Sequence, residues 1–531
     1  MTVGPVQQAA RRTADVAGLA PALGFVVLAL LVALPILLHP YLPLVDLPNH
    51  IARHYIAATD GGPLARYYDY STSLTPNAAV DMAFLLFGNP DDPARFSQVI
   101  MAVYAVALVA SAMLLSRVAW GRWSTWPLAS ALVVYNGNFF WGFQNFLVAI
   151  PVAITVLALW LATEERPAWQ RLLILGPMVA LTYLLHFFAF SVLALAAFGR
   201  ETQRLLSSKG RFREALGRGL MMSLPFALPL AWLVWDVLTA PASPAGNFTR
   251  AKVWKEWIDI FGSLALAPMD GLGTGVNATG SLVVALLVAG LVILLRPGAV
   301  RLRLAPSLVG PVIAVAVGVA LAPSWLNGVA WVHIRLPFVL ALILIASSRW
   351  EGLGPRPALA VGAVVLALVA ARSAAFDRFA EIHNIEMQDL ASTLADLPPG
   401  ARLFPMQQEG DNRIWHVQAY AVVQRQAFVP TLFQGVHNLE VLPEWHDSSI
   451  AAGQSVPVQL ALWALNGDEA KTDHWSSTEL AFLEDWPAKF DHVLLIGPVD
   501  QAADELPSWL RPVSSSGRYA LFEIRPEERA P

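Results

Sequence analysis

Four ionisable residues with helical spacing follow the first apolar segment of the chain. Asp46, His50, Arg53 and His54 stand at positions i, i+4, i+7 and i+8, so a helix beginning near Pro48 would place them along one side. Such a group of side chains can transfer protons and bind anions. Asp46 also has a structural explanation, because an Asp before Leu-Pro-Asn is a good N-cap. Capping does not explain the three basic residues beside it, so we expect Asp46 to be functional.

The elements that must position these residues are transmembrane helices. Of the 531 residues, 56% are hydrophobic and 14% are charged, whereas soluble domains contain about 25% charged residues. The composition therefore indicates an integral membrane protein. The net charge of -4 and the scattered basic residues give no sign of a nucleic-acid partner. The absence of cysteine excludes disulfides, thiolate metal ligands and thiol nucleophiles.

A window of about 20 residues, the length that crosses about 30 Å of hydrocarbon, predicts about eleven spans. They cover residues 19–39, 95–116, 125–140, 142–163, 170–185, 187–200, 219–238, 278–295, 304–322, 330–348 and 357–374. Lys and Arg precede the first span and fill alternate loops, and positive charge is retained on the cytoplasmic side. The N-terminus is therefore expected in the cytoplasm, with Asp46 and the C-terminus outside.

Three regions outside the spans carry further structure. The helix at Asp46 should lie on the membrane with Leu47, Ile51, Tyr55 and Ile56 toward lipid, followed by a second short helix at 78–88 that is too short to span. The segment 253–262 reads as another amphipathic helix, either a gate for a lipid substrate or a structural helix resting on the membrane.

From residue 377 the composition becomes polar again. Short apolar runs, read as strands, alternate with a helical stretch at 380–397 and predict a small α/β domain. The predicted strands are 401–406, 419–433, 491–498 and 518–524.

We therefore expect a polytopic α-helical membrane protein in several parts. They are a cytoplasmic N-terminus (1–18), a transmembrane domain (19–376) with periplasmic loops at 40–94 and 239–277, and a periplasmic α/β domain (377–531). The compact loops, the lack of Cys and the Ala/Arg-rich composition favour a bacterial inner membrane.

The order of these elements resembles the GT-C glycosyltransferases over about residues 19–374. The similar features are a first anchor, an outside loop that opens with an acidic residue on a surface helix, a second short helix ending in Gly88, and Ala94-Arg95 before the next span. Enzymes of this family use polyprenyl-phosphate sugars as donors, and their first outside loop supplies a catalytic acidic residue. Only Asp46 matches that residue. The twin-acid form common in the family is absent, so the resemblance leaves a divalent cation, Mg²⁺ or Mn²⁺, undecided.

The implied reaction needs a base for the acceptor proton and cations for the departing phosphate. Asp46 is the expected base. His333 and Arg335 stand at the outer start of the tenth expected span, in an Arg-Leu-Pro pattern that resembles some GT-C proteins, although His333 stands where an Asp is often found. An unpaired cation there costs about 2.5–3.5 kcal/mol, so Arg335 needs an anion. That anion is either the donor phosphate or the carboxylate of Asp81 or Asp270. Alternatively, the Arg335 side chain reaches the membrane interface, where water solvates its charge. Arg53 and Arg66 are alternative phosphate ligands.

Further polar residues of the outer loops are candidates for binding substrate. Asn138 and Gln144 could bond sugar hydroxyls while Trp141 stacks on a sugar ring, although an aromatic belt is the favoured explanation of Trp141. His186 is either an interfacial residue or a proton shuttle. His50 and His54 complete the predicted substrate-binding set. His416, Tyr420 and the aromatic run after Pro430 are candidates to face the site and select the acceptor.

The sequence thus predicts a hexosyl- or pentosyltransferase acting on a glycan, lipid or protein acceptor. A lipid or polysaccharide transporter or flippase would also have many spans, but its expected internal repeats and broken helices are not found. A non-catalytic membrane assembly subunit would tolerate the loss of Asp46.

Overall fold

The computed structural model describes most of the chain. The exceptions are residues 1–4, 60–61, 73–75, 209–210, 240–247, 250–252, 269–273, 327–328, 409–410, 435–437, 452, 467–480, 499–505 and 526–531.

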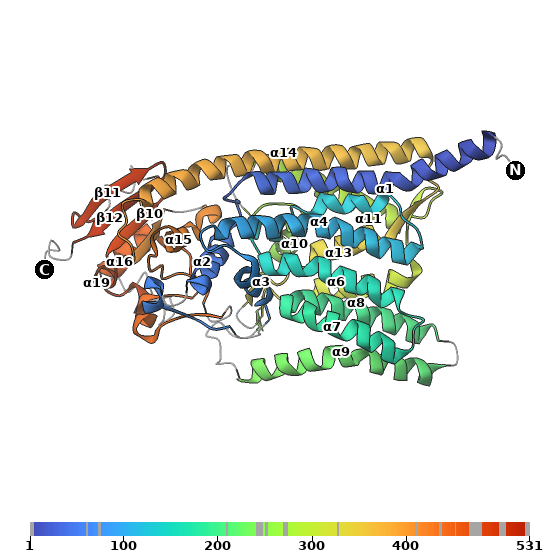
Figure 1. The fold of residues 1–531 in the computed structure, drawn as a ribbon, viewed down its shortest axis with the longest axis horizontal. Coiled ribbons are helices and arrows are strands. Elements are labelled where there is room, and N and C mark those ends of the chain that lie inside the picture. The colour runs from blue at the N-terminus through green and yellow to red at the C-terminus, as the bar shows by residue number, and fades with distance from the viewer. Residues whose placement is uncertain are drawn as a thin grey trace.

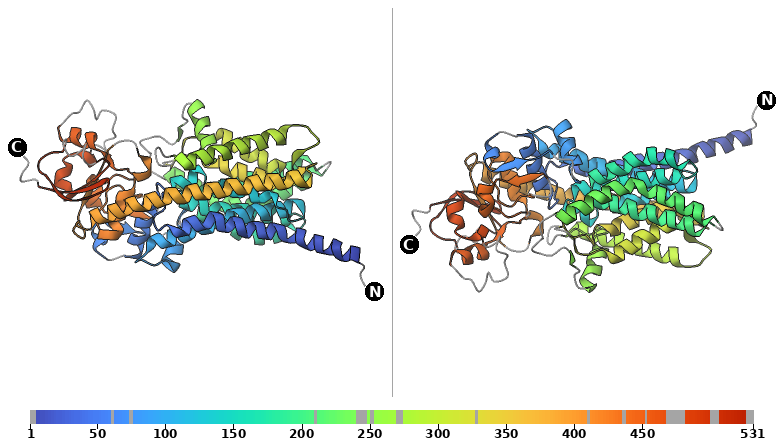
Figure 2. Two further views of the ribbon diagram at one scale, coloured as in Figure 1. Left: turned by 90° about the horizontal axis from the view of Figure 1, so that it is seen from above. Right: turned by 90° about the horizontal axis from the view of Figure 1, so that it is seen from below.

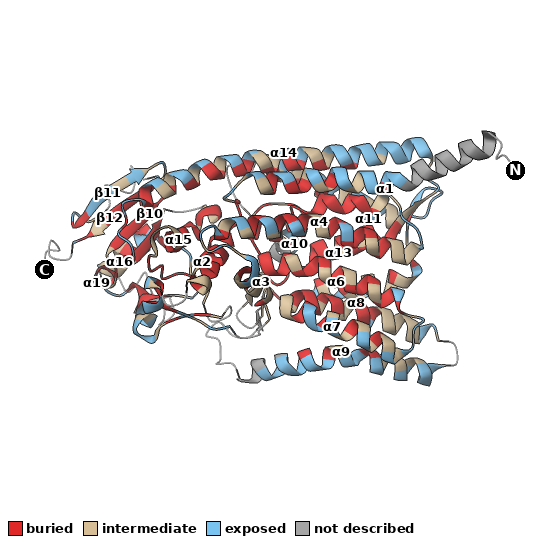
Figure 3. Cartoon of the chain, viewed as in Figure 1, coloured by how far each residue is buried: buried red, intermediate tan, exposed pale blue. Residues whose placement is uncertain are grey.

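Long apolar helices run along the long axis of the molecule and form a bundle (Figure 1). They are α1 (Pro5–Leu38), α4 (Pro93–Trp120), α6 (Gln144–Ala162), α7 (Ala168–Leu185), α8 (Phe187–Leu206), α9 (Phe212–Thr239), α11 (Thr274–Leu295), α12 (Val309–Leu321), α13 (Leu336–Ser347) and α14 (Pro355–Leu394). Within the described residues, six helices are long and apolar enough to cross a membrane, and two shorter apolar helices accompany them. The centre of the bundle is buried, whereas many of the described residues of α9 and of the first half of α14 are exposed (Figure 3).

Every expected span but one lies on one of these helices. The exception is 125–140, which forms the 3₁₀ helix η2 (Trp126–Val133) and then the short helix α5 (Gly137–Trp141). All residues of η2 from Pro127 to Val133 are buried. A 3₁₀ helix rises about 2.0 Å per residue against 1.5 Å in an α-helix, so this short segment covers more of the bundle than an α-helix of equal length. The total of eleven spans stays a prediction.

Helix α14 joins the bundle to the C-terminal region without a break. It passes through the position at which the sequence predicted the end of the last span and a separate helix at 380–397. The C-terminal region and the N-terminal end of α1 lie at opposite ends of the molecule in all views (Figures 1 and 2). The expected boundary between residues 376 and 377 therefore falls inside one continuous helix.

The C-terminal region contains a five-stranded mixed sheet in the order β11-β12-β10-β7-β9. The strands are β7 (Leu403–Gln407), β9 (Val456–Pro457), β10 (His492–Ile496), β11 (Leu510–Ser516) and β12 (Tyr519–Ile524). β7 runs parallel to β9 and β10, whereas β12 is antiparallel to β10 and β11. Strands are confirmed within the predicted runs 401–406, 491–498 and 518–524.

The predicted strand at 419–433 is wrong. This segment forms helix α15 (Tyr420–Arg425) and then an extended piece in which Phe428 makes an isolated bridge to Arg402. A short apolar run fits a buried helix as well as a strand, and the turn at Gln426, with φ of 51°, divides this one into two elements.

The first loop is docked against the C-terminal region. It contains α2 (Leu47–Ala58), β1 (Tyr68–Tyr70) and α3 (Ala79–Phe87), and β1 pairs with β8 (Leu439–Val441). The Tyr68 hydroxyl donates to the Val429 carbonyl at 2.8 Å. The lipid-facing interfacial position expected for α2 is wrong, because Leu47 and Ile51 are each 1% exposed. Segments from the distant C-terminal region, including α15, cover the apolar face that the sequence assigned to lipid.

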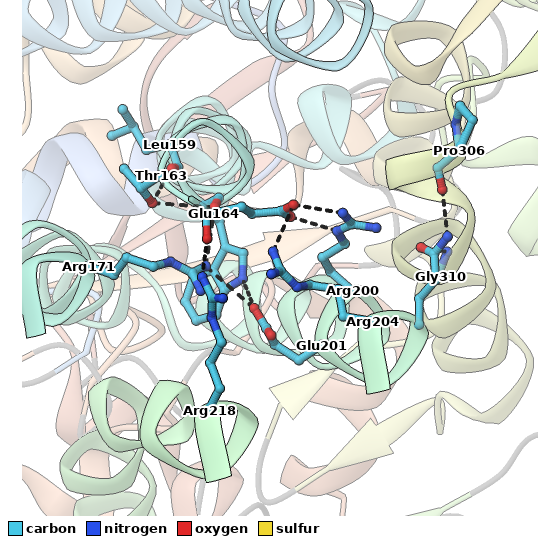
Figure 4. Close-up of polar contacts among 12 residues, drawn as sticks. Leu159, Thr163, Glu164, Arg171, Arg200, Glu201, Arg204, Arg218, Pro306 and Gly310 are labelled. Carbon is cyan, nitrogen blue, oxygen red and sulfur yellow. Dashed lines mark hydrogen bonds and ion pairs between the residues drawn. The ribbon is translucent and has the colours of Figure 1, made fainter. Parts of the chain in front are cut away.

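Hydrogen bonds and ion pairs of arginine side chains connect helices at the end of the bundle opposite the C-terminal region (Figure 4). The Glu164 carboxylate, just after α6, accepts hydrogen bonds from Arg200 at 2.6 and 2.7 Å and pairs with Arg204 at 2.9 Å. Its carbonyl accepts a hydrogen bond from Arg218 of α9, and Arg171 of α7 contacts Glu201 at 3.4 Å. These contacts fix the relative positions of α6, α7, α8 and α9.

Candidate active site

A cavity of about 560 Å³ lies where the bundle meets the C-terminal region. One wall comes from the loops at this end of the bundle and the other from residues after α14. The bundle wall contains Asp46, Trp141, Phe143, Trp325, Val329, Ala330, Trp331 and Arg335. The C-terminal wall includes Trp415, His416, Phe433, Gln434, Gln454, Ser455, Leu460 and Phe482.

The Asp46 carboxylate is available to the cavity because it does not cap its helix. Asp46 occupies the N-cap position of α2, but its side chain makes no capping hydrogen bond. The Asn49 and His50 amides donate instead to the Asp46 carbonyl, at 3.1 and 3.3 Å. The structural role that the sequence allowed for this side chain is therefore not observed.

The loop between η2 and α6 fixes the backbone at Asp46. The Asp46 amide donates to the Trp141 carbonyl at 3.0 Å. The Asn136 side chain caps α5 by accepting from the Asn138 and Phe139 amides. Gly142 then ends α5 with φ of 79°, where a side chain would be strained. A Cβ on Gly142 would also lie 2.9 Å from the Asp46 nitrogen, so the close approach of the two segments requires glycine.

The surroundings of Asp46 change its acidity. Burial raises the pKa of the Asp46 carboxyl to about 7, and the positive charge of Arg335 opposes that rise. A carboxylate with a pKa near neutral pH is a stronger base than an ordinary aspartate, yet it is substantially ionised at pH 7. Asp46 thus has the acidity expected of a general base.

Arg335 is a buried cation in the bundle wall of the cavity. It is 8% exposed, lies 3.8 Å above the centroid of the Phe143 ring, and donates to the Ala330 carbonyl at 3.4 Å. Within the described part of the chain, no carboxylate oxygen lies within 4 Å of its guanidinium. Of the two carboxylates predicted as structural partners, Asp81 pairs elsewhere and Asp270 lies outside the described residues. The arrangement suits an anionic ligand.

Aromatic rings form much of the cavity surface. Trp141 stacks on Trp331 with 5.3 Å between ring centroids, and Trp415 lies 5.8 Å from Trp141. Trp331 has φ of 59°, a backbone conformation that a bulky residue rarely adopts and that tends to occur at functional sites. Trp141, the candidate for stacking on a sugar ring, lines the cavity, and its contact with a sugar stays a prediction.

Arg53 and His54 do not line the cavity. The Arg53 guanidinium donates to the Asp81 carboxylate at 2.8 Å, and His54 Nε2 lies 3.0 Å from the same carboxylate. Burial alone would raise the pKa of Asp81, but Arg53 and His54 hold it well below its usual range. His50 lies at the edge of this cluster, 3.1 Å from Arg53. The helical spacing correctly grouped these residues, but their shared partner is Asp81 of α3.

The remaining predicted residues surround the site without lining it. The Asn138 amide donates to the Ile334 carbonyl at 3.1 Å and so supports the segment that carries Arg335. Gln144 is fully buried, and neither side-chain amide atom has a hydrogen-bond partner among the described residues. His186 accepts from the Phe188 amide at 3.0 Å, and His333 Nε2 lies 3.7 Å from Asp259 of α10 (Val253–Gly262). Arg66, the other alternative phosphate ligand, donates to the Gly400 carbonyl.

The C-terminal wall contains residues that the sequence expected to face the site. His416 was one of the candidates to select the acceptor, and the structure places its Nε2 3.7 Å from Asp46 Oδ1. Trp331, Trp415 and Phe143 were not predicted. The outer loops are rich in aromatic residues, and this richness was the available sign of an aromatic site wall. An interfacial aromatic belt gives the same pattern.

The described residues do not form a metal site by themselves. No group of three His, Asp or Glu side chains among them could hold a metal ion. Asp46 is the one carboxylate among the described lining residues, and it shares the cavity with the positive charge of Arg335. One carboxylate beside a guanidinium binds Mg²⁺ or Mn²⁺ poorly, because these ions prefer several oxygen ligands. The proposed reaction therefore assigns no step to a metal.

No protein-family model and no curated protein matches the sequence. Among solved structures, the chain is similar to the crystal structure of ArnT from Cupriavidus metallidurans in the apo state, with 14% sequence identity and a TM-score of 0.49 over 96% of this chain and 98% of that chain. We infer function from the geometry of the site and not from this likeness.

Proposed function

We propose that the chain is a GT-C-type glycosyltransferase that moves a sugar from a polyprenyl-phosphate donor to a hydroxyl acceptor. The observation that carries the proposal is that one cavity contains both Asp46, whose pKa is raised to about 7, and Arg335, a buried cation that no carboxylate contacts among the described residues. A general base and an anion-binding group are the two functions that this transfer needs.

The donor occupies the bundle wall. Its prenyl tail stays in the hydrocarbon, so its phosphate lies near the membrane surface at the end of the bundle, where Arg335 is placed. The guanidinium forms charge-assisted hydrogen bonds with the phosphate, which serves as its anionic partner. The sugar then rests on the ring of Trp141 or Trp331, both of which line the cavity.

Asp46 acts on the acceptor. Its carboxylate takes the proton of the acceptor hydroxyl while the hydroxyl oxygen attacks the anomeric carbon of the sugar. The bond between that carbon and the phosphate oxygen breaks, and its electron pair leaves with the polyprenyl phosphate, whose charge Arg335 stabilises. The proton later passes from Asp46 to water.

The proposed topology places this reaction outside the cytoplasm. With the N-terminus in the cytoplasm, the first loop, the cavity and the C-terminal region lie on the periplasmic side of a bacterial inner membrane. The lipid-linked sugar and the hydroxyl acceptor would then meet at the outer surface of the membrane. The acceptor is a glycan, a lipid or a protein.

The test uses the full-length protein in lipid nanodiscs with a panel of radiolabelled hexosyl and pentosyl polyprenyl phosphates. Release of polyprenyl phosphate and of labelled product is measured. Asp46→Asn should lower transfer by about 10²- to 10⁴-fold. Arg335→Gln should raise the donor KM by about tenfold or more, the effect of losing a hydrogen bond to a charged group.

Two exposed residues provide matched controls. Asp69→Asn removes an exposed carboxylate from the same first loop, and Arg378→Gln removes a guanidinium that is 71% exposed. Both should behave as wild type. Wild-type transfer rates in Asp46→Asn would overturn the proposed base. Movement of intact lipid-linked sugar without covalent transfer would instead indicate a transporter or flippase.

A further inference from the structure

The C-terminal region brings one titratable side chain into direct range of Asp46. His416 Nε2 lies 3.7 Å from Asp46 Oδ1, with the two side chains 6% and 16% exposed. This separation is too long for a hydrogen bond between them. It allows a hydroxyl oxygen at about 2.8 Å from each atom, the usual length of such hydrogen bonds.

Resting on the glycosyltransferase function proposed above, we propose that His416 is a catalytic residue that binds the acceptor, a sugar hydroxyl held between His416 and Asp46. In this arrangement the C-terminal wall is the acceptor subsite and the bundle wall is the donor subsite. The C-terminal region therefore completes the active site.

The packing around His416 holds it at this position. Its ring lies edge-on to Phe433, with 5.2 Å between centroids, and the Phe433 amide donates to the Asn49 side chain on α2 at 3.3 Å. Tyr41, a few residues before Asp46, is hydrogen-bonded in both directions to Asn384 of α14. Phe433 thus links His416 to the helix that follows Asp46, and α15 packs on α2 at the same end of the bundle (Figure 1).

The chemistry of the C-terminal wall suits a sugar. Of the described lining residues, only Asp46, Arg335 and His416 have ionisable side chains. The other polar side chains on this wall, Gln434, Gln454 and Ser455, are neutral, and Trp415 and Phe433 offer aromatic faces. Neutral hydrogen-bonding groups beside aromatic rings are the surface that a sugar ring contacts favourably.

The protonation state of His416 fits this role. Burial lowers the pKa of its imidazole to about 4, so the ring stays neutral while Asp46 ionises near pH 7. A neutral imidazole with hydrogen on Nε2 donates to the acceptor oxygen and directs its O–H toward Asp46 Oδ1. Asp46 still takes the proton, and the bonds formed and broken remain those given above.

The experiment compares His416→Ala with wild type in nanodiscs, with hexyl glucoside as the acceptor probe and water as the competing acceptor. His416→Ala should raise the KM for hexyl glucoside by about tenfold, the effect of one lost neutral hydrogen bond, and leave the donor KM unchanged. Millimolar imidazole should restore part of the transfer, because it can occupy the space left by the side chain. His446→Ala, which changes an exposed imidazole outside the cavity, is the control and should behave as wild type.

The outcomes separate this inference from the proposed function. An unchanged KM for hexyl glucoside in His416→Ala, with Asp46→Asn inactive, would overturn the role of His416 alone. Loss of activity without imidazole rescue, together with a lower melting temperature, would assign His416 a structural role. Donor hydrolysis by the wild type without transfer to hexyl glucoside would overturn the sugar subsite. Full activity of Asp46→Asn would overturn the proposed function itself.

Discussion

Gly142 lies directly against the backbone of Asp46, and a Cβ on Gly142 would come within 2.9 Å of the Asp46 nitrogen. The proposed base is therefore positioned by a residue without a side chain, on a loop almost a hundred residues later in the chain. The contact is between backbones, so a substitution at Gly142 must move Asp46 or the loop.

Gly142→Ala should lower transfer by at least tenfold in a protein that still folds, because small displacements of a catalytic group have large effects on rate. Gly121→Ala is the matched control: Gly121 ends α4 with φ of 73°, but a Cβ there would meet nothing within 4 Å. Both substitutions place a side chain at a positive φ, which causes a backbone strain of about 1 kcal/mol. Only Gly142→Ala also displaces Asp46. Equal activities of the two variants, measured with melting temperatures, would contradict the positioning role.

The rate of transfer should depend on the ionisation of Asp46. Because the pKa of Asp46 is raised to about 7, the base is protonated below that pH and ionised above it. We expect kcat/KM to fall about tenfold per pH unit below 7 and to level off above it, as for a single essential base. A rate that stays constant from pH 5 to pH 8 would show that another group accepts the proton.

Asp46 should also make stability depend on pH. An aspartate in the unfolded chain has a pKa of about 3.9, so between about pH 4 and 7 the folded protein binds the proton more tightly. The stability contributed by that proton is present at low pH and lost as pH rises through 7. Asp46→Asn should therefore raise the melting temperature at pH 8 relative to wild type and change it little at pH 4. Asp69→Asn, an exposed carboxylate, should show no such trend.

The buried pair of Arg53 and Asp81 should be required for folding. Both side chains are 1% exposed, and Asp81→Asn leaves the buried guanidinium without its counter-charge, a change that costs about 3–5 kcal/mol. Glu351→Gln removes a carboxylate that pairs with three partly exposed arginines, Arg301, Arg303 and Arg349, and should have a much smaller effect because solvent screens these pairs.

Melting temperatures and expression levels of the two variants measure this difference. If Asp81→Asn instead kept the wild-type melting temperature but raised the donor KM, the cluster would have the substrate-binding role first predicted for Arg53 and His54.

The sequence by itself determined where the apolar helices lie, because the length and composition of an apolar segment are local properties. The same holds for Asp46 and Arg335, which stand out as polar groups at the ends of such segments. The 3₁₀ form of η2 could not be read in this way, since a hydropathy window counts apolar residues and carries no information about the hydrogen-bonding pattern.

Only the tertiary structure decided which polar residues meet. Arg53 and His54 share a helical face with His50, yet their partner is Asp81, and the apolar face of α2 is covered by protein from the C-terminal region instead of lipid. His416 stands beside Asp46 because α14 and the docked first loop bring the C-terminal region against the first loop. Contacts between residues so far apart depend on how complete elements pack, and no local spacing or composition records that packing.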